Sequence, residues 1–571
     1  MEEENTEIKV IDNFDITRQS LISKIKISIY SMPVHKMFYS VLLFFIIIMS
    51  MIIMTIEYSY KYTLRAPATG GIYREASINN IRYIDPIFAN NETEVSISRL
   101  VYSGILRQEG ELYIPEIAES INVSTDGLVY TIKLKKVKFS DGSDLTSADI
   151  MYTIELIQDS LINSPRHNNW KNIELIAIDV NTISMKTKLP ISMLQQALTQ
   201  GIIKKSEWIK LPKDSLSLSN LNINAIGAGP YKMKQITENN KIISDVSLII
   251  NDKYSSISKL PFIQYIYYKV FANNNEVYNA IKNGDTYTLI GVDPSEVNNL
   301  IKSNNKINIK SAKMYRTYSL FFNTNNDKEL SSLNYRRDLR DSINRDHMLD
   351  SVLAGHGSKA NNVYTKDYES KNNIYNLATT SKIYTGKTLN ISTINNNELI
   401  KVANMIKEDW AKIGVMADIH TYEIGEFHQD VIKDRNYSVL LFAVDTFNDD
   451  DIYNLWHSSG RNYPGSNITN YYSTNLDKNL EKLSSTVNKE EKSIIYGDIG
   501  DELDHNVAWI PLYNPYMLAT MASDIHINID DNIYSSDRLL DYIRNAYIDT
   551  ETVYNMFTTD TFYKKINDFL H

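Results

Sequence analysis

One stretch of this chain constrains its fold more than any other: residues 126–152 read DGLVYTIKLKKVKFSDGSDLTSADIMY. After a first turn pair, Asp126-Gly127, apolar residues take alternate positions, which is the period of a half-buried strand. A second pair, Asp141-Gly142, predicts a chain reversal. Thr146 is the expected helix N-cap, and the Asp149 carboxylate can reach back to the backbone N–H of that cap. The stretch therefore predicts a strand, a turn and a capped helix in succession.

The composition narrows the class of protein. The 571 residues exceed one ordinary core, so two or three lobes are expected. With 43% hydrophobic and 22% charged residues, the chain is globular rather than disordered. A formal net charge of −10 argues against a nucleic-acid partner, which usually requires a basic face. The chain contains no cysteine, which excludes disulfides, thiolate metal sites and a lipid-modified N-terminal cysteine.

An apolar run near the N-terminus predicts one transmembrane helix. Residues 37–56 carry no charge and, at ~1.5 Å per residue, span a hydrocarbon core of about 30 Å. The run is longer than the apolar part of a secretory signal, and residues 57–60 make a poor cleavage site, so we expect an uncleaved signal-anchor. Residues 1–36 form the expected cytosolic tail, and residues 57–69 form a stalk. Within the tail, residues 16–36 suit either an amphipathic helix on the membrane surface or a short cytosolic helix.

The central stretch resembles the family of extracytoplasmic solute-binding proteins that serve ATP-binding-cassette importers of oligopeptides, dipeptides and nickel. The residues that carry the resemblance are Pro115-Glu116-Ile117-Ala118-Glu119-Ser120, Asp126-Gly127, Tyr130-Thr131-Ile132, Phe139-Ser140-Asp141-Gly142, Leu145-Thr146-Ser147-Ala148-Asp149-Ile150 and Tyr152. The resemblance extends more thinly from Gly70 to roughly Pro515, through Gly70-Gly71-Ile72-Tyr73-Arg74-Glu75-Ala76, Ile84-Asp85-Pro86, Gly227-Ala228-Gly229-Pro230-Tyr231 and Trp509-Ile510-Pro511-Leu512-Tyr513.

The resemblance implies a fold and its division into lobes. The fold is α/β, a two-lobed periplasmic-binding-protein-like fold with two hinge strands, near residues 270 and 508, and an extra small subdomain. The expected first lobe contains residues 70–100, 201–270 and 509–571. Residues 101–200 form its small outer subdomain, and residues 271–508 form the second lobe. Apolar spacing also predicts helices over residues 95–106, 335–352 and 402–414 and a buried strand over residues 437–444.

The resemblance also implies where a ligand binds. In oligopeptide-binding members, an Asp at the lobe interface pairs with the α-ammonium of the peptide, and Asp445 matches that position. A buried ammonium requires such a carboxylate partner. Phe442 stands where the family has Trp, which leaves the pocket in doubt. The full set of expected ligand contacts is Asp445, Phe442, Ala443, Asn90, Asn91, Glu92, Trp456, Asn467 and Tyr471.

For each of these residues a structural role is the alternative: a loop or cap aspartate for Asp445, a solvated loop for residues 90–92, and core or loop for the rest. Arg336, Arg337 and Arg340 suit either a ligand carboxylate or structural ion pairs on a helix face.

The residues argue against an enzyme. The sequence contains no His-Glu-x-x-His and no Gly-x-Ser-x-Gly, and its ten histidines are scattered without metal-ligand spacing. We expect no cofactor. The resemblance implies a membrane-anchored receptor whose large C-terminal domain lies outside the cell membrane, captures peptides and delivers them to a permease with its ATPase subunits. Two alternatives remain: an anchored sensor or scaffold that has lost transport, and a binder of oligosaccharide or a nickel complex.

Overall fold

The computed structural model describes residues 33–109, 112–125, 128–187, 191–240, 242–365, 367–369, 383–446, 449–463, 465–486, 488–529, 532–533 and 542–554. The expected turn at Asp126-Gly127 and the expected tail up to residue 32 lie outside these ranges. The chain divides into two compact units, Met1–Pro67 with Thr550–His571 and Ala68–Asp549.

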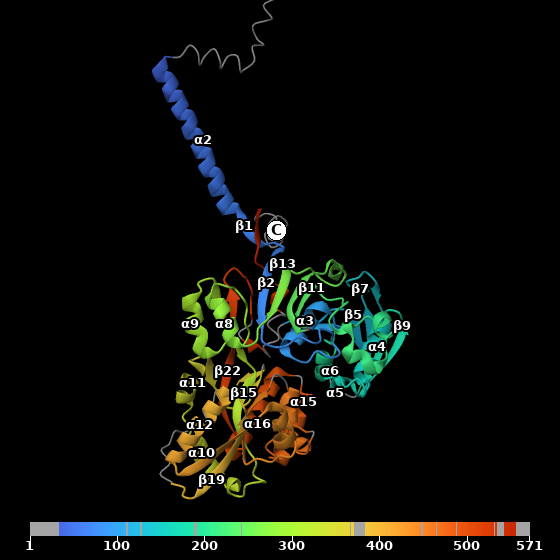
Figure 1. Ribbon diagram of the computed structural model, residues 1–571, viewed down its shortest axis with the longest axis vertical. Coiled ribbons are helices and arrows are strands. Elements are labelled where there is room, and N and C mark those ends of the chain that lie inside the picture. The colour runs from blue at the N-terminus through green and yellow to red at the C-terminus, as the bar shows by residue number, and fades with distance from the viewer. Residues whose placement is uncertain are drawn as a thin grey trace, which may run out of the picture. The chain divides into compact units, whose positions relative to one another are not determined.

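The first unit contains the apolar helix and one strand pair (Figure 1). Helix α2, Val34–Tyr62, includes the run that we expected to cross a membrane, and its part Val34–Glu57 is long and apolar enough to do so. Strand β1, Thr63–Pro67, pairs antiparallel with β24, Thr550–Tyr554. The segment expected as a stalk is therefore mostly the end of a helix followed by a paired strand.

A four-stranded sheet in the order β11-β12-β13-β2 lies in the second unit. Its strands are β2 Gly70–Ser77, β11 Tyr231–Asn239, β12 Ile242–Ile250 and β13 Ile263–Val270. Strand β2 runs parallel to β13, and helix α3, Glu92–Val101, shares the core of this sheet through Ile97 and Leu100. The carboxyl end of β2 therefore lies beside that of β13, and open α/β folds bind ligands outside this end of their strands.

Residues 128–152, which were expected to form a strand, a turn and a capped helix, fold as expected. Strand β6, Val129–Leu134, buries Tyr130, Ile132 and Leu134 in a sheet of the order β5-β6-β10-β9. The partner strands are β5 Ala118–Val123, β9 Ile173–Asp179 and β10 Thr182–Thr187. Helix α4, Ser147–Gln158, begins after Thr146, whose backbone N–H donates to the Asp149 carboxylate at 2.8 Å. The predicted cap is confirmed.

A larger sheet has the strand order β20-β19-β21-β15-β22-β14-β23, with β16 paired to β22. Its strands are β14 Ile307–Met314, β15 Arg316–Phe322, β16 Gly357–Lys359, β19 Lys387–Ile394, β20 Val415–Tyr422, β21 Val439–Asp445, β22 Trp509–Ala522 and β23 Asn532–Ile533. Alternate residues of its central strands enter two different cores. Leu320 and Leu441 pack with helix α12, Asn397–Lys412, whereas Phe321 and Leu440 pack with α15 and α16, Thr474–Ser485 and Lys489–Asn506.

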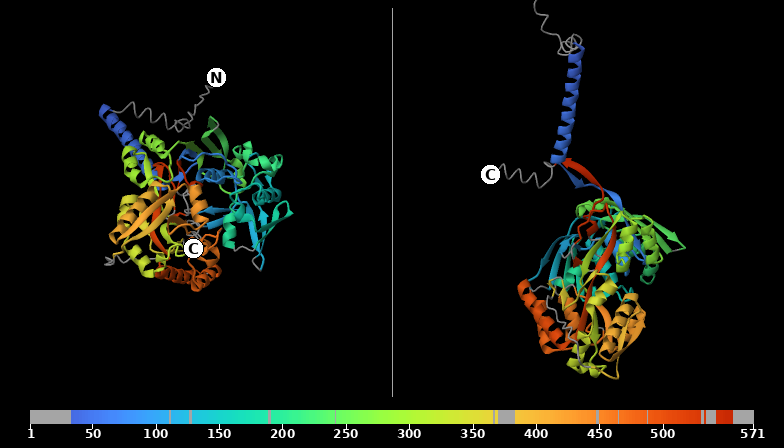
Figure 2. Two further views of the ribbon diagram at one scale, coloured as in Figure 1. Left: turned by 60° about the horizontal axis from the view of Figure 1, so that its bottom comes forward. Right: turned by 90° about the vertical axis from the view of Figure 1, so that its left-hand side faces the viewer.

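Helices therefore cover both faces of this sheet. The right-hand view of Figure 2 shows the red-orange helices α15 and α16 on one side and the yellow-orange helix α12 on the other. Strands buried on both faces read as continuous apolar runs, which explains the run that we predicted over residues 437–444. Its first residues, Val439 to Leu441, are fully buried, and the run becomes more exposed toward Asp445.

The remaining described elements are short. The helices are α5 His167–Trp170, α6 Ile191–Ala197, α7 Lys205–Trp208, α8 Asn274–Lys282, α9 Val297–Ser303, α10 Leu333–Asp341, α11 Arg345–Leu353, α13 Ile424–Glu426 and α14 Asp449–Trp456. The strands are β3 Leu106–Glu109, β4 Leu112–Pro115, β7 Val137–Lys138, β8 Asp144–Leu145, β17 Tyr364–Thr365 and β18 Tyr368–Glu369.

Three helices differ from their predicted bounds. The helix predicted over residues 402–414 is α12, which begins earlier, at Asn397, and ends at Lys412. Helix α3 ends at Val101, and Leu106 begins β3, so the helix expected over residues 95–106 is wrong at its C-terminal end. The helix expected over residues 335–352 is two helices, α10 and α11, that break at Ser342. Asn344 caps the second helix by accepting from the backbone N–H of His347, and such capping residues favour a new helix start over continuation.

The apolar cores meet at a different place from the expected lobe boundary at residues 270–271. Val277, Leu289 and Leu300 share a core with Ala76 of β2 and Leu518 of β22. Residues 277–307 therefore pack with strands of the expected first lobe and not with the cores of β15, β19 and β21. The cores change between Met314 and Leu320 on one crossing segment and between Tyr513 and Met517 on the other.

Candidate functional site

An ion pair lies where the chain crosses between these cores. Arg316 begins β15 directly after β14, and Asp445 ends β21, its antiparallel neighbour, so the register of the two strands places them opposite each other. Arg316 Nε donates to Asp445 Oδ1 at 2.7 Å, and Nη2 donates to Oδ2 at 3.0 Å. The two side chains stay about one third exposed, at 34% and 37%. The expected ligand aspartate is thus already paired, yet it remains open to solvent.

Two aromatic rings lie next to this pair on β15 and β22. Tyr318 and Tyr513 stack with ring centroids 4.9 Å apart. The Tyr513 hydroxyl donates to Glu398 Oε1 at 2.8 Å, and burial raises the pKa of the Glu398 carboxyl above its usual value. The two hydrogen bonds that Arg316 donates to Asp445 raise the pKa of the Arg316 guanidinium, and the charge of Glu92 adds a smaller increase. Burial of Arg316 acts in the opposite direction but is the weaker effect. Arg316 therefore keeps its positive charge throughout the usual pH range.

The loop of residues 90–92 has divided roles. Asn91 caps α3 by accepting from the backbone N–H of Glu94 at 3.0 Å, and its own amide donates to Asn80 O at 2.9 Å. These bonds give Asn91 a structural role. Asn90 and Glu92 are exposed, and both line two cavities of about 320 and 440 Å³. Asn91 also lines the larger of these cavities, so all three expected contacts of this loop lie where a ligand can reach them.

The larger cavity lies at the carboxyl end of β2. Glu75 and Ser77 line it from β2, Glu92 and Thr93 from α3, and Gly291 from the segment beyond α8. Glu75 is only 4% exposed, and its Oε2 accepts from the Tyr73 hydroxyl at 3.0 Å. Burial raises the pKa of the Glu75 carboxyl to about 8, and nearby Glu92 contributes in the same direction.

Three of the expected contacts serve the core instead. Trp456 is fully buried and packs edge-on against Trp509, with ring centroids 5.3 Å apart. Asn467 is fully buried and donates to Trp456 O and Tyr471 O at 3.2 and 3.0 Å. Tyr471 is half-buried, and its hydroxyl reaches Glu502 at 3.5 Å. The burial of Trp456 and Asn467 argues against the ligand contacts that we expected of them.

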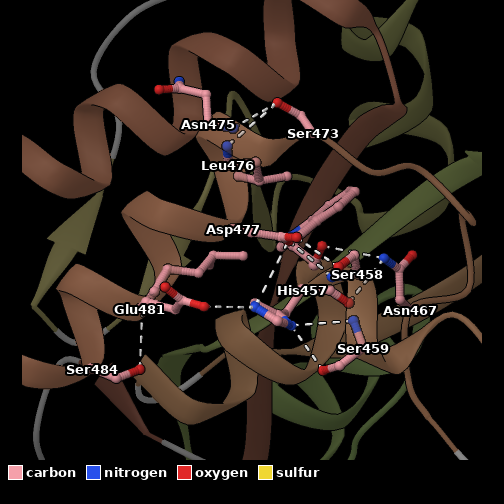
Figure 3. Close-up of polar contacts among 12 residues, drawn as sticks. His457, Ser458, Ser459, Asn467, Ser473, Asn475, Leu476, Asp477, Glu481 and Ser484 are labelled. Carbon is pink, nitrogen blue, oxygen red and sulfur yellow. Dashed lines mark hydrogen bonds and ion pairs between the residues drawn. The ribbon is translucent and has the colours of Figure 1, made fainter.

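A cluster of serine, histidine and carboxylate residues follows Trp456 (Figure 3). His457 Nδ1 lies 2.8 Å from Ser459 Oγ, while His457 Nε2 lies 3.9 Å from Asp477 Oδ1, too far for a hydrogen bond. The Asp477 carboxylate instead accepts from Ser458 N and Ser458 Oγ at 2.9 and 2.6 Å. The His457 ring stacks on the Tyr453 ring, with ring centroids 4.3 Å apart. These contacts fasten the turn after α14 and do not form a nucleophile–base–acid relay.

The arginines of α10 have structural partners. Arg336 is 7% exposed and donates to three main-chain oxygens, those of Val507, Asn506 and Leu330, at 3.0, 2.5 and 2.5 Å. Arg340 binds Asp341 and Asp504 at 2.8 and 3.0 Å. Of the two roles that the sequence left open for these arginines, the structural one is observed.

Two residues of the site were not predicted from the sequence. Arg316 was not singled out, although a strand that begins with a charged residue opposite Asp445 was the available signal. Glu75 was read only as part of the opening strand, although Tyr73, Glu75 and Ser77 share one face of that strand. Among the described residues, no group of three or more His, Asp or Glu side chains is arranged to hold a metal ion.

Comparisons with known proteins bear on this arrangement. A sequence model of the bacterial extracellular solute-binding proteins, family 5 (middle part), matches residues 113–465, more than half of the chain. Among curated proteins, the glutathione-binding protein GsiB of Escherichia coli O6:K15:H31 (strain 536 / UPEC) is 23% identical over 473 residues, which cover 76% of this chain and 87% of that protein.

Solved structures of similar fold include two that this chain covers almost completely. The substrate-binding protein CtaP from Listeria monocytogenes has a TM-score of 0.70 and 22% identity, and the alignment covers 84% of this chain and 99% of that chain. The oligopeptide-binding protein AppA from Bacillus subtilis, in complex with a nonapeptide, has a TM-score of 0.65 and 20% identity over 85% of this chain and 100% of that chain. At these identities the likeness establishes the two-lobed fold.

Proposed function

Because this chain belongs to the bacterial extracellular solute-binding proteins of family 5, which are not enzymes, we propose that it captures extracellular peptides between two lobes and delivers them to an ATP-binding-cassette permease. The observation that carries the ligand assignment is the exposed Arg316–Asp445 pair where the chain crosses between the cores. Two relatives support a peptide ligand: AppA was solved in complex with a nonapeptide, and the curated protein GsiB is named for glutathione, which is a tripeptide.

The Arg316–Asp445 pair suits the amino terminus of a peptide. A carboxylate offers about four lone-pair directions, so Asp445 can accept from an ammonium while Arg316 still holds it. The remaining guanidinium N–H groups of Arg316 are donors for a peptide carbonyl. Ala443 lies on the same face of β21 as Asp445, whereas the expected contact Phe442 lies on the other face and packs against Phe427, with ring centroids 5.4 Å apart. Asn90 and Glu92 line cavities of the expected first lobe. In this proposal, Ala443, Asn90 and Glu92 border the bound peptide.

The two lobes close by motion at the crossing segments. From the distribution of the cores, we propose that the first crossing lies at residues 314–316 and the second at residues 513–516. Asn514 is 5% exposed, and its amide donates to Arg316 O at 2.9 Å and to Thr317 Oγ1 at 2.7 Å. It therefore links the two crossing segments to each other beside the proposed ligand.

Helix α2 serves as an uncleaved anchor in this proposal, with the large domain outside the cell. Anchoring raises the concentration of the receptor near its permease without any new contact. The cysteine-free chain allows a direct test. Val34→Cys and Glu119→Cys variants of the full chain, labelled in intact cells with a membrane-impermeant maleimide, should react only at residue 119. Labelling at both positions, or release of the chain from washed membranes, would contradict the anchor.

The ligand assignment is tested on the full chain, purified in mild detergent without denaturation. Native mass spectrometry should reveal co-purifying peptides, and isothermal titration of alanine tetrapeptides and glutathione should give saturable binding. If oligosaccharides or a nickel–histidine complex bind and no peptide does, that ligand class replaces peptides in the proposal. If none of these ligands binds, a sensor or scaffold role becomes the better explanation.

A further inference from the structure

The cavity of about 440 Å³ at the carboxyl end of β2 contains a buried carboxyl group that the proposed function does not use. Glu75 lines this cavity and is only 4% exposed. The Tyr73 hydroxyl donates to one of its oxygens, Oε2, and the other oxygen has no hydrogen-bond partner among the described residues. Buried carboxylates in proteins are normally paired with a cation or with several donors. A carboxyl group with one oxygen left without a hydrogen bond among the described residues therefore lies in the wall of this cavity.

The backbone fixes Glu75 in this position. Arg74 O accepts from Thr288 N, and Ala76 N donates to Thr288 O, both at 2.8 Å. The side chains of β2 alternate, so that Tyr73 and Glu75 are buried while Arg74 is exposed. Arg74 thus lies on the other face of the strand from Glu75. The Glu75 side chain is therefore buried, with its carboxyl group hydrogen-bonded to Tyr73, and is not an exposed surface side chain.

The charge of the cavity lining has one sign. Among the described residues that line it, Glu75 and Glu92 are the acids, and none is Lys, Arg or His. The two carboxyl groups act on each other, because Glu92 contributes to the upward shift in the pKa of Glu75. Two acids in one cavity favour a cation that both can approach. The other polar lining groups are small hydroxyls and amides, such as Ser77 and Asn274, and apolar side chains such as Ile78 and Leu289 complete the lining. This mixture suits the apolar stem and the polar cationic end of a basic side chain.

We propose that Glu75 receives a cationic group of the bound ligand, an ammonium or guanidinium on a peptide side chain, so that this receptor prefers basic peptides. The proposal rests on the proposed peptide-binding function and names the substrate class for the same site. Glu92 lines this cavity together with Glu75, and its charge also contributes to the raised pKa of Arg316. In this inference, a single peptide presents its amino terminus to Asp445 and a basic side chain to Glu75.

The test uses matched peptides on the full chain. Tetrapeptides with lysine at each position of an alanine background are compared by isothermal titration with the same peptides carrying norleucine, which lacks only the charged amine. At one position, the lysine peptide should bind about 10- to 100-fold more tightly, because a charged hydrogen bond is worth about 1.5–3 kcal/mol. Glu75→Gln should abolish this preference and leave norleucine peptides unaffected. Glu119→Gln, a surface acid on β5, should keep it.

The pH dependence provides a second measurement on the same pair of peptides. Tyr73, Tyr268 and Glu92 are the titratable groups that act on Glu75, and the two tyrosines stay neutral because burial raises their pKa further. A free Glu75 with a pKa of about 8 must lose its proton to receive a cation, so lysine-peptide affinity should rise from pH 6 to 8 and then level off. Norleucine peptides should lack this rise, as should the Glu75→Gln variant.

The outcomes separate the two proposals. Equal binding of lysine and norleucine peptides at every position overturns the basic preference and leaves peptide capture standing. A lysine preference that survives Glu75→Gln also overturns the assignment to this residue. Failure of every peptide to bind, with the variants still folded by circular dichroism, overturns the proposed function and this inference together.

Discussion

Arg316 and Asp445 bind each other through two parallel hydrogen bonds, 2.7 and 3.0 Å long, between strands that are adjacent in the sheet but 129 residues apart in the chain. A two-pronged guanidinium–carboxylate bond fixes orientation as well as charge. Because each partner stays about one third exposed, this pair contributes little to stability, as surface ion pairs do. Its position at the crossing of the chain instead suits a role in ligand binding.

The first prediction concerns Asp445→Asn. The substitution deprives the peptide ammonium of its charged partner, so peptides with a free amino terminus should lose about 10-fold or more in affinity. N-acetylated peptides have no such ammonium and should lose much less. Isothermal titration measures both, with Asp418→Asn, an exposed acid on β20, as the control. Equal losses for the two kinds of peptide would remove Asp445 from this role.

The second prediction separates Arg336 from its neighbour Arg337. Arg336 satisfies three main-chain oxygens from a buried position, whereas Arg337 makes one exposed hydrogen bond to His505 O at 3.0 Å. Lysine cannot reach three carbonyls from one planar group, so Arg336→Lys should lower the free energy of unfolding by about 2–4 kcal/mol. Arg337→Lys should change it by less than about 0.5 kcal/mol.

Urea unfolding followed by tryptophan fluorescence checks the Arg336 prediction, because Trp509 lies in the neighbouring core. If the two lysine variants unfold at the same urea concentration, the bonds at the end of α16 do not stabilise the chain as argued.

Local features of the fold were predictable from the sequence, and long-range ones were not. The strand and cap of residues 129–149 depend on alternation and on a side chain three positions from its partner, so their signals are local. The Arg316–Asp445 pair depends on the register between β15 and β21, which no short stretch encodes. Likewise, the apolar pattern of residues 277–300 is the same whichever core receives it, so only the packing shows that these residues share a core with Ala76 and Leu518.

The candidate site shows the same division. The resemblance predicted Asp445, Asn90 and Glu92 as ligand contacts; the structure leaves all three exposed, and their role in binding stays a prediction. Trp456 and Asn467 occupy the matching stretch, but their side chains face the core. Sequence position alone does not tell whether a side chain at the end of a helix points inward. Successive residues of a helix point about 100° apart, so a shift of one position moves a side chain to another face.

The third prediction concerns the helix cap that the sequence specified. Asp149 is 7% exposed and accepts from Thr146 N, Thr146 Oγ1 and Lys205 N, at 2.8, 2.9 and 2.9 Å. Asp149→Ala leaves these three donors unpaired, so we expect a loss of about 1–3 kcal/mol in the free energy of unfolding. Asp144→Ala, in which a largely exposed acid loses one ion pair to Lys138, is the control and should be nearly neutral. A similar effect of the two changes in thermal unfolding would contradict the cap as a stabilising element.

The fourth prediction concerns stability against pH without any ligand. Burial raises the pKa of Glu75 from 4.5 to about 8 in the folded chain. Between these two values the folded state holds a proton that the unfolded state has released, so the free energy of unfolding falls as pH rises from 5 to 8. Glutamine at position 75 does not titrate, so Glu75→Gln should make the free energy of unfolding depend less on pH. The wild-type free energy of unfolding minus that of the variant should fall by about 2–4 kcal/mol between pH 5 and pH 8.

Urea unfolding at closely spaced pH values measures the Glu75 effect, with Glu119→Gln as a variant that should keep the wild-type slope. Asp85 is also buried, and burial raises its pKa to about 7, so part of the slope must remain in Glu75→Gln. A profile that is the same in wild type and Glu75→Gln would mean that the carboxyl group is ionised at neutral pH in the free protein. Because an ionised carboxylate in this cavity requires a cation, that result would place a bound counter-ion next to Glu75 before any peptide arrives.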